Sequence, residues 1–483
     1  MKIFQSLEKT IDCWFLIATA FFFFLLRLPS LFEPLWYGDE GIYQVLGMGI
    51  NAGRLLYREI WDNKPPLLYL IYSLFSSDQF MVRFASLVFG TLAIFAIYML
   101  LRKIYKEKRV VLFATWLFAL IFGLPIIEGN IANAENFMLF PIILAGLLVY
   151  NTHYTLYPKR YTLFAAGFLL GLAFLIKVVA LFDFAAFFLY LIFIYIDKKR
   201  QRKIAIKNLL LFSGAFAVPI ATTFLFFATK GALADLIEAV FRQNVGYVGY
   251  GNTLLIPQGF LILKLLMLSI GAFFIFTKRN VLGNKLIFIF LWFGFSLFNA
   301  FFSQRPYTHY LLVLLPSFVI ASGLLFEKQY RKITLFILII TLFIVGTSFT
   351  FFEKTAGYYQ NYLSFVFFKK DVSEYQKFFD PTTPKDYAIA AFLKMRLEKK
   401  DQIFVWGNSA QIYTLLGKLP PGRYTVAYHI TSSDKSIKET QKILSKTRPR
   451  YVVFLGTLPV PLHFVGYTQA ITLYNSTIYE RVF

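Results

Sequence analysis

Cysteine is nearly absent from this chain of 483 residues, and charged residues are scarce. The single cysteine, Cys13, excludes an intramolecular disulfide and any cysteine-based metal site. Only 16% of the residues are charged, against about 25% in an average soluble domain. Because 58% of the residues are hydrophobic and 20% are aromatic, we expect lipid to be the main solvent of this chain.

Histidine is also rare, with four residues in the whole chain, and no two have the spacing of a zinc site. The sequence offers no Ser-His-Asp or Cys-His arrangement either. We therefore expect no metal-ligand cluster and no nucleophilic triad. A divalent cation such as Mg²⁺ or Mn²⁺ stays open as a cofactor, but no residue can be assigned to it.

Long apolar runs dominate the sequence instead. Each of nine runs, of 14 to 21 residues, can form one membrane-spanning helix. The apolar stretch from Tyr161 to Ile196 is too long for one crossing and contains Lys177 and Asp183, so we expect two short helices there. The chain is thus predicted to be an α-helical polytopic membrane protein with about eleven transmembrane helices, the first of them an uncleaved anchor. The nine runs lie near Trp14 to Leu31, Met81 to Leu101, Val110 to Ile127, Phe137 to Tyr150, Leu209 to Phe227, Phe260 to Phe276, Leu286 to Phe302, Leu311 to Phe326 and Ile333 to Phe352.

The formal net charge of +23 comes from short basic clusters between the apolar runs. Such clusters are typical of cytoplasmic loops rather than of a nucleic-acid-binding face, so we expect no nucleic-acid partner. With a cytoplasmic N-terminus, every cluster falls on the inner side of the plasma membrane. The clusters are Arg102 to Arg109, Pro158 to Arg160, Asp197 to Lys203, Thr277 to Asn280 and Glu327 to Lys332.

The apolar runs stop near residue 352, and the odd number of spans places the remainder outside the cell. Within it, the segments 401–407 and 449–456 read as short buried strands, and 435–446 has helical spacing. We therefore divide the chain into a transmembrane module, residues 1–352, with a first outer loop at 33–79, and an extracytoplasmic α/β domain, residues 353–483.

The first outer loop contains most of the chemistry that the sequence suggests. Asp39 and Glu40 directly follow the first span, and the next apolar residues recur at helical spacing, which predicts a helix lying in the membrane interface. Lys64 precedes Pro65 and Pro66, which begin another helix. A carboxylate to take a proton and a cation to hold a phosphate suit a lipid-phosphate reaction. Alternatively, Asp39 caps its helix and Lys64 extends to the lipid headgroups.

Four further ionisable residues, together with Tyr310, are candidate members of the functional site, because ionisable groups at membrane depth are costly and tend to be functional. Glu135 is a second carboxylate, or an acid that stabilises a helix start. Lys177 lies at the break between two helices, or pairs with Asp183. Arg305 and His309 lie where one span turns into the next and could bind phosphate oxygens, or form an ordinary interfacial turn together with Tyr310.

Taken together, these motifs resemble the membrane glycosyltransferases of the dolichyl-phosphate-mannose protein mannosyltransferase type, glycosyltransferase family 39, in its bacterial branch. The resemblance covers most of the chain. It is carried by Asp39-Glu40 and by KPPLLYL (64–70), NAENFMLF (133–140), GLAFLIK (171–177), RPYTHYLLVLLP (305–316) and FVWG with IYTLLGKLPPGRY in the tail.

The resemblance implies the GT-C fold and an inverting transfer of a sugar from a polyprenyl-phosphate donor to an acceptor outside the membrane. Asp39 would be the general base, supported by Glu40 and Glu135. Lys64, Arg305 and Lys177 would hold the donor phosphate, with His309 beside them. Related aminoarabinose transferases have an acid where this chain has Asn63, so their metal coordination is not expected here.

Two other classes of function compete with this interpretation. A transporter or flippase would line a pathway between inverted repeats, and we find no such repeat. A non-catalytic scaffold would use the α/β domain to bind a partner. The expected partners of the transferase are the lipid-linked sugar donor, membrane lipids and an external acceptor, which could be a protein, a lipid or a glycan.

Overall fold

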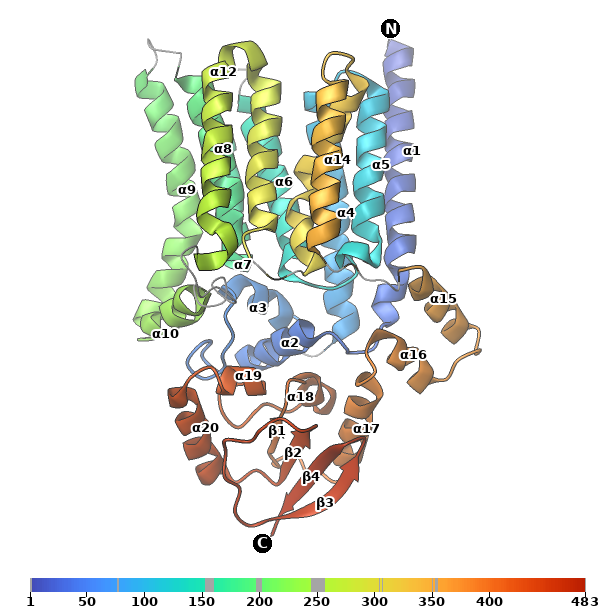
Figure 1. The fold of residues 1–483 in the computed structure, drawn as a ribbon, viewed down its shortest axis with the longest axis vertical. Coiled ribbons are helices and arrows are strands. Elements are labelled where there is room, and N and C mark those ends of the chain that lie inside the picture. Colours follow the sequence, from blue (N-terminus) through green and yellow to red (C-terminus); the bar gives the residue numbers. More distant parts are fainter. Residues whose placement is uncertain are drawn as a thin grey trace. The chain divides into compact units, whose positions relative to one another are not determined.

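The computed structural model describes residues 2–75, 78–152, 160–196, 202–244, 257–303, 305, 307–349, 351 and 355–482. Contacts between residues divide the chain into two compact units (Figure 1). The helical unit comprises Met1–Ser30, Phe84–Thr229 and Arg242–Thr355. The mixed unit comprises Leu31–Arg83, Lys230–Phe241 and Ala356–Phe483.

The helical unit is built from the predicted apolar runs. Among the described residues, seven helices are long and apolar enough to cross a bilayer, and Arg160–Ile176 and Leu315–Phe326 are shorter apolar helical stretches. The total of about eleven spans stays a prediction. The elements are α1 (Lys2–Arg27), α4 (Gln79–Ile104), α5 (Lys108–Gly123), η2 (Pro125–Ile127), α6 (Ala134–Asn151), α7 (Arg160–Ile176), η4 (Val178–Ala180), α8 (Leu181–Tyr195), α9 (Arg202–Thr229), α12 (Pro257–Ala300), η7 (Thr308–Val313), α13 (Leu315–Ser322), η8 (Gly323–Phe326) and α14 (Arg331–Ser348).

Helix α12 folds back on itself. A straight helix of its 44 residues would be about 66 Å long, yet the Lys264 ammonium donates a 2.7 Å hydrogen bond to the carbonyl of Phe301. Gly283, between them, has a φ of +69°, which a right-handed helix cannot contain and which glycine adopts without strain. The two runs predicted at Phe260 to Phe276 and Leu286 to Phe302 therefore pair as a hairpin.

The long stretch from Tyr161 to Ile196 breaks at Lys177, as predicted. The backbone of Lys177 is extended, and it separates α7 from η4 and α8. Helix α7 packs closely on α9 at Gly167 and Gly171. A Cβ added at either glycine would lie only 2.2 or 2.4 Å from a carbonyl oxygen of α9. Small residues four apart permit this approach between apolar helices.

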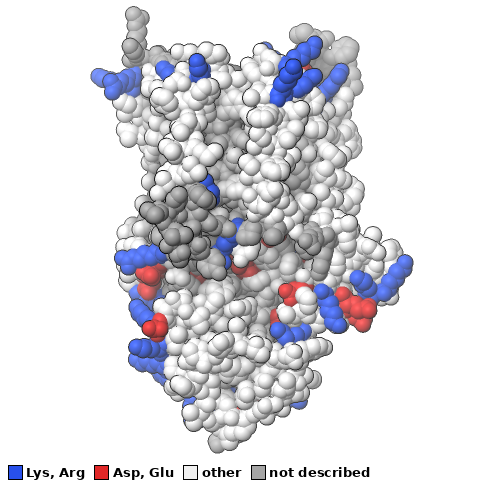
Figure 2. All heavy atoms as spheres, in the orientation of Figure 1, with Lys and Arg blue, Asp and Glu red and all other residues white. Residues whose placement is uncertain are grey.

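Two of the basic clusters, 102–109 and 327–332, meet at one end of the helical unit through Lys285, whose Nζ lies 4.3 Å from the centre of the Tyr105 ring. Asp12 on α1 pairs with Lys108 on α5 at 2.7 Å and with Arg102 on α4 at 3.6 Å. Lys285 on α12 pairs with Glu327, directly after η8. Figure 2 shows one group of Lys and Arg side chains at the top of the view. The predicted clusters at 158–160 and 197–203 lie mostly outside the described residues.

The mixed unit holds a four-stranded sheet with the order β1-β2-β4-β3. The two buried strands predicted from sequence pair in parallel, with Ile403 opposite Tyr451, and the predicted helix is α20. The hairpin β3-β4 was not predicted from the sequence; its strands are joined at Tyr474 and Asn475, both with positive φ. The strands are β1 (Ile403–Trp406), β2 (Tyr451–Leu455), β3 (Tyr467–Leu473) and β4 (Ser476–Arg481). The helices are η1 (Leu28–Phe32), α2 (Gly38–Asn51), α3 (Pro66–Ser73), α10 (Leu233–Ile237), η6 (Glu238–Arg242), α15 (Thr355–Val366), α16 (Val372–Phe379), α17 (Thr383–Lys394), α18 (Gln411–Leu416), α19 (Ala427–Ile430) and α20 (Asp434–Thr447).

The first outer loop packs with the C-terminal domain and belongs to the same unit. The Gln411 side chain on α18 donates a 3.1 Å hydrogen bond to the carbonyl of Trp36, and the Trp61 amide donates to the carbonyl of Arg423 at 2.9 Å. Helix α2 was expected to lie in the interface with one face on lipid. Instead it packs against protein on several sides, since a Cβ at Gly41 would meet Gln411 and one at Gly47 would meet the backbone of α3.

Candidate functional site

Asp39 lies in the first turn of α2, where its carboxylate is half-buried. The phenol of Tyr43, one turn later on the same helix, donates a 2.9 Å hydrogen bond to Asp39 Oδ2. The ring of Tyr43 is buried, and burial together with the charges of Asp39 and Asp62 raises the pKa of its hydroxyl well above the usual value. Tyr43 therefore stays a neutral donor to the carboxylate. The alternative that Asp39 caps the helix is wrong, because the N-cap residue is Tyr37 and makes no side-chain cap bond.

Lys64 lies just before α3, as predicted from the two prolines, and its ammonium approaches the same tyrosine. Lys64 Nζ is 5.8 Å from the centre of the Tyr43 ring and 3.0 Å from Asn63 Oδ1. Two tyrosine hydroxyls fix the Lys64 backbone: its N–H donates to Tyr69 at 2.9 Å, and its carbonyl accepts from Tyr57 at 2.8 Å. Asp39 and Lys64 thus lie against one aromatic ring with part of each side chain exposed.

Asp62 is buried and binds Tyr69, one of the two tyrosines that hold the Lys64 backbone. The Tyr69 hydroxyl donates a 2.7 Å hydrogen bond to Asp62 Oδ2, and His429 Nε2 lies 3.5 Å from Asp62 Oδ1. Burial by itself would raise the pKa of Asp62, but the Lys64 charge and the contact with His429 outweigh it, so the pKa falls below the usual value. His429 lies on α19 and packs edge-on against Trp61 at 4.8 Å. A side chain of the C-terminal domain therefore takes part in positioning Lys64.

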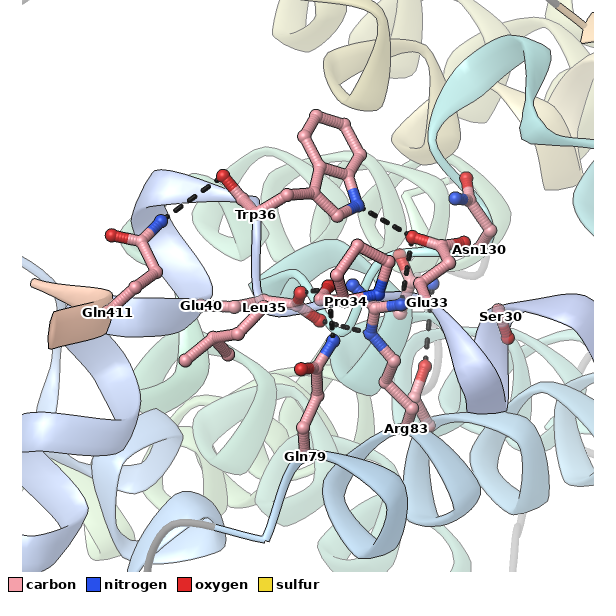
Figure 3. A network of polar contacts seen from close by, with 12 residues as sticks. Ser30, Glu33, Pro34, Leu35, Trp36, Glu40, Gln79, Arg83, Asn130 and Gln411 are labelled. Carbon is pink, nitrogen blue, oxygen red and sulfur yellow. Dashed lines mark hydrogen bonds and ion pairs between the residues drawn. The ribbon is translucent and has the colours of Figure 1, made fainter. Parts of the chain in front are cut away.

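Glu40 has a different environment from Asp39. Arg83 is buried between Glu40 and Glu33, with Nε 3.0 Å from Glu40 Oε1 and Nη1 2.8 Å from Glu33 Oε2 (Figure 3). Trp36 also donates to Glu33 at 2.7 Å. Two carboxylates on one guanidinium suit a buried structural ion pair. Glu40 therefore fixes the start of α2 and leaves Asp39 as the more accessible acid of the pair.

The helical unit brings together the other candidate residues. Glu135 lies in the first turn of α6, as an acid favoured by the helix dipole, and forms an ion pair with Lys177. Lys177 Nζ lies 4.5 Å from the centre of the Tyr310 ring. Asp183, which the sequence analysis considered as a partner for Lys177, accepts a 2.8 Å hydrogen bond from Trp292.

His309 adjoins the same cluster through Tyr310, whose ring centre is 4.6 Å away. His309 Nδ1 is 3.1 Å from Glu128 Oε2, and Thr308 donates to Glu128 Oε1 at 2.8 Å. Arg305 lies half-buried, and its backbone N–H donates to Ser303 at 3.3 Å. Glu135, Lys177 and His309 are thus neighbours in the helical unit, whereas Asp39, Glu40 and Lys64 are neighbours in the mixed unit.

Sequence reasoning missed several members of both groups. Tyr43 could have been found, because residues four apart on a helix share a face. Glu128 lies in the predicted outer loop with Glu135, but nothing in the sequence distinguishes it. Asp62 and His429 meet across most of the chain, and no local pattern indicates such a contact. Within the described residues, no group of three or more His, Cys, Asp or Glu side chains could hold a metal ion.

The chain is similar to one known protein family and to two solved structures. Residues 57–232 match the model of the family described as dolichyl-phosphate-mannose-protein mannosyltransferase (PMT), a range that includes Lys64, Glu135 and Lys177. No curated protein matches the sequence. Two solved structures of ArnT from Cupriavidus metallidurans are similar over nearly the full length of both chains. The structure bound to undecaprenyl phosphate has a TM-score of 0.59 at 14% identity and covers 97% of this chain and 98% of its own. The apo structure has a TM-score of 0.60 at 13% identity, with 98% of each chain covered.

At that identity the ArnT structures show only that the fold is shared. The family match shows in addition that residues 57–232 resemble the PMT family in sequence. The matched range begins after Asp39 and Glu40, so this match does not include the two acids. Over residues 57–232 the chain is similar in sequence to the PMT family, and over nearly its full length it shares the GT-C fold of the ArnT structures.

Proposed function

We propose that this chain moves a sugar from a polyprenyl-phosphate carrier to an acceptor, with Asp39 as the general base and Lys64 as a ligand of the donor phosphate. The observation that carries the proposal is that Asp39 and Lys64 both contact Tyr43, with both side chains partly exposed. One of the similar structures is of ArnT bound to undecaprenyl phosphate, which supports a polyprenyl phosphate as the lipid.

The chemistry needs only these two kinds of group. Asp39 takes the proton of an acceptor hydroxyl while the acceptor oxygen attacks the anomeric carbon of the sugar. The bond from that carbon to the phosphate oxygen breaks, and the lipid phosphate leaves with the electron pair. Lys64 stabilises the charge that develops on the leaving phosphate. Attack from the side opposite the phosphate inverts the configuration of the sugar.

The remaining candidates receive supporting roles in this proposal. Glu40 positions Asp39 by fixing the first turn of α2 through Arg83. Lys177 and Arg305 are proposed as further cations for the donor phosphate, with His309 as a hydrogen-bond partner of its oxygens and Glu135 as the acid that holds Lys177 in place. A phosphate would then compete with Glu135 for the Lys177 ammonium.

We also propose that the chain lies in the plasma membrane with its N-terminus in the cytoplasm and the mixed unit outside. The basic clusters that meet at one end of the helical unit support this orientation. The acceptor would then be an external protein, lipid or glycan.

A transfer assay with purified protein in liposomes tests the proposal. A labelled polyprenyl-phosphate sugar is the donor, and release of free polyprenyl phosphate is followed together with transfer of the label. Lys64→Met removes the charge and keeps the length of the side chain, so we expect the donor KM to rise. Lys435→Met, at an exposed position of α20, is the control. If Lys64→Met leaves both kcat and donor KM unchanged, Lys64 is not a ligand of the phosphate.

A further inference from the structure

The C-terminal end of α15 carries an apolar surface that is unusual for a domain in water. Leu363, Val366, Phe367 and Phe368 are all exposed, Phe367 by 66% and Phe368 by 95%. A contiguous exposed patch of this kind marks a surface that binds a protein or a membrane. Figure 1 shows that α15 leads into α16 through a short turn, and the two phenylalanines begin that turn.

The backbone of Phe368 has a left-handed conformation that glycine adopts more easily than phenylalanine. Its φ is +55°, in the left-handed region, where glycine or asparagine normally ends a helix. The backbone N–H groups of Phe368 and Lys369 bond to the carbonyls of Phe365 and Ser364, which closes the helix end at this position. A bulky aromatic residue there is unfavourable both sterically and by exposure to water. An apolar environment around the ring would remove the cost of exposing it to water.

Contacts within the mixed unit place α15 at the end of a membrane span. The first span extends from Thr10 to Phe32. The ring of Tyr362 on α15 lies 5.9 Å from the ring of Phe32, and Tyr358, one turn earlier, donates a 2.5 Å hydrogen bond to Glu33. Phe32 also contacts Phe80, at the start of the next span, with ring centres 6.1 Å apart. Helix α15 therefore packs against Phe32, the last residue of one candidate membrane span, which in turn contacts the start of the next.

The chain itself gives a second, independent limit on the position of α15. Thr355, its first residue, follows Ser348, the last residue of the span α14, by seven positions. An extended chain covers at most about 25 Å over that separation. The start of α15 therefore lies within that distance of the end of a candidate membrane span.

Charge complements the apolar surface. Lys369 directly follows the two phenylalanines and is exposed, and Lys370 donates to Asn361 on α15 at 2.9 Å. Asp371 and Glu374, the nearest acids, bond to each other's backbone N–H groups in the capping box that begins α16. Aromatic residues followed by lysines are typical of segments at headgroup depth, because the rings enter the acyl boundary and the ammonium groups reach the phosphates.

We propose that the end of α15, from Leu363 to Lys369, inserts into the headgroup region of the adjacent leaflet and anchors the mixed unit to the bilayer. The occupant of the surface is lipid, with Lys369 at the phosphate level. The anchor would fix the depth of the mixed unit, which carries Asp39 and Lys64, but it does not depend on the activity of these residues. A second copy of the chain on the same surface is the competing occupant.

A fluorescent label at position 368 tests this proposal in the full-length protein. Cys13→Ser removes the native thiol, and Phe368→Cys and Val465→Cys each supply one labelling site. Val465 is the matched control because it is 85% exposed and lies beside strand β3 rather than beside the end of a span. Each variant is labelled with an environment-sensitive dye and reconstituted in phosphatidylcholine and phosphatidylglycerol liposomes. Quenching is measured with nitroxide lipids and with aqueous iodide.

We expect nitroxide lipids to quench the label at 368 and iodide to quench the label at 465, with a blue-shifted emission only at 368. Equal quenching of both labels by iodide, with no effect of nitroxide lipids at 368, would overturn the proposal. Protection of position 368 from both quenchers would also overturn it, because the surface would then be covered by protein. Sugar transfer is not part of this readout, so its result is separate from that of the proposed function.

Discussion

The hydroxyl of Tyr43 donates a 2.9 Å hydrogen bond to the carboxylate of Asp39, one turn earlier on α2. This bond orients the proposed base, so Tyr43→Phe should keep the Asp39 side chain but leave it less well positioned. A hydrogen bond to a charged group contributes about 1.5 to 3 kcal/mol, which corresponds to a loss of kcat on the order of tenfold or more. Steady-state transfer kinetics check this. A lower kcat with little change in donor KM is expected, and a change in KM alone would argue against an orienting role.

Tyr69 connects Lys64 to Asp62, and its hydroxyl is the shared atom. Tyr69→Phe leaves the Lys64 N–H and one oxygen of Asp62 without this partner in a buried place. An unsatisfied buried group costs about 1 to 3 kcal/mol, so the thermal midpoint should fall. The donor KM should rise as well, because Lys64 loses its fixed position. Tyr474→Phe, at the exposed turn between β3 and β4, is the control and should change neither quantity. A lower midpoint with an unchanged donor KM would show that Tyr69 is only structural.

Asp62 should make stability depend on pH in acid. Its pKa in the folded protein is lowered below the usual value near 4, against the effect of burial, by Lys64 and His429. The ionised carboxylate therefore stabilises the fold above about pH 4, and this contribution is lost as the pH falls below that value. Asp62→Asn removes it. Thermal melts between pH 3 and pH 7 should show the largest difference between the wild type and Asp62→Asn at pH 7, and a smaller one below pH 4. A difference that is the same at every pH would contradict this origin.

Glu40 is expected to stabilise the fold and to position Asp39 rather than to take part in the reaction. Its side chain and that of Arg83 are almost fully buried, and loss of one partner from a buried pair costs about 3 to 5 kcal/mol. Glu40→Gln should therefore lower the thermal midpoint strongly and reduce transfer through the position of Asp39. Glu33→Gln, on the other side of Arg83, should have a similar effect on stability. A Glu40→Gln protein of wild-type stability that cannot transfer sugar would instead make Glu40 a catalytic group.

Local patterns predicted the elements and some of the site. The apolar runs, the break at Lys177, the strands β1 and β2 and the helix α20 follow from hydrophobic periodicity and length. The position of Lys64 before α3 follows from Pro65 and Pro66. The strands β3 and β4 were missed because polar residues interrupt them and neither is buried along its whole length, so no buried apolar run marks them.

Contacts between distant parts of the chain could not be predicted. Asp62 meets His429, and Glu33 accepts a bond from Tyr358, over hundreds of residues. Each residue alone has an ordinary sequence environment, and only the folded chain shows that they are partners. For the same reason, the grouping of the first outer loop with the C-terminal domain was not foreseen. The roles of Asp39 and Lys64 came from the family resemblance, and the structure adds the tyrosines that hold them.

The most direct test of the account is sugar transfer by Asp39→Asn, which keeps the shape of the side chain and removes its basicity. Asp78→Asn is the matched control, because Asp78 is an exposed acid of the same unit that accepts a 3.0 Å bond from the Met81 amide. General base catalysis contributes about 10²- to 10⁴-fold, so Asp39→Asn should lose at least about a hundredfold in kcat while its thermal midpoint and donor KM stay near those of the wild type. Asp78→Asn should transfer sugar normally. An Asp39→Asn protein with wild-type kcat would contradict the assignment of the base and the mechanism built on it.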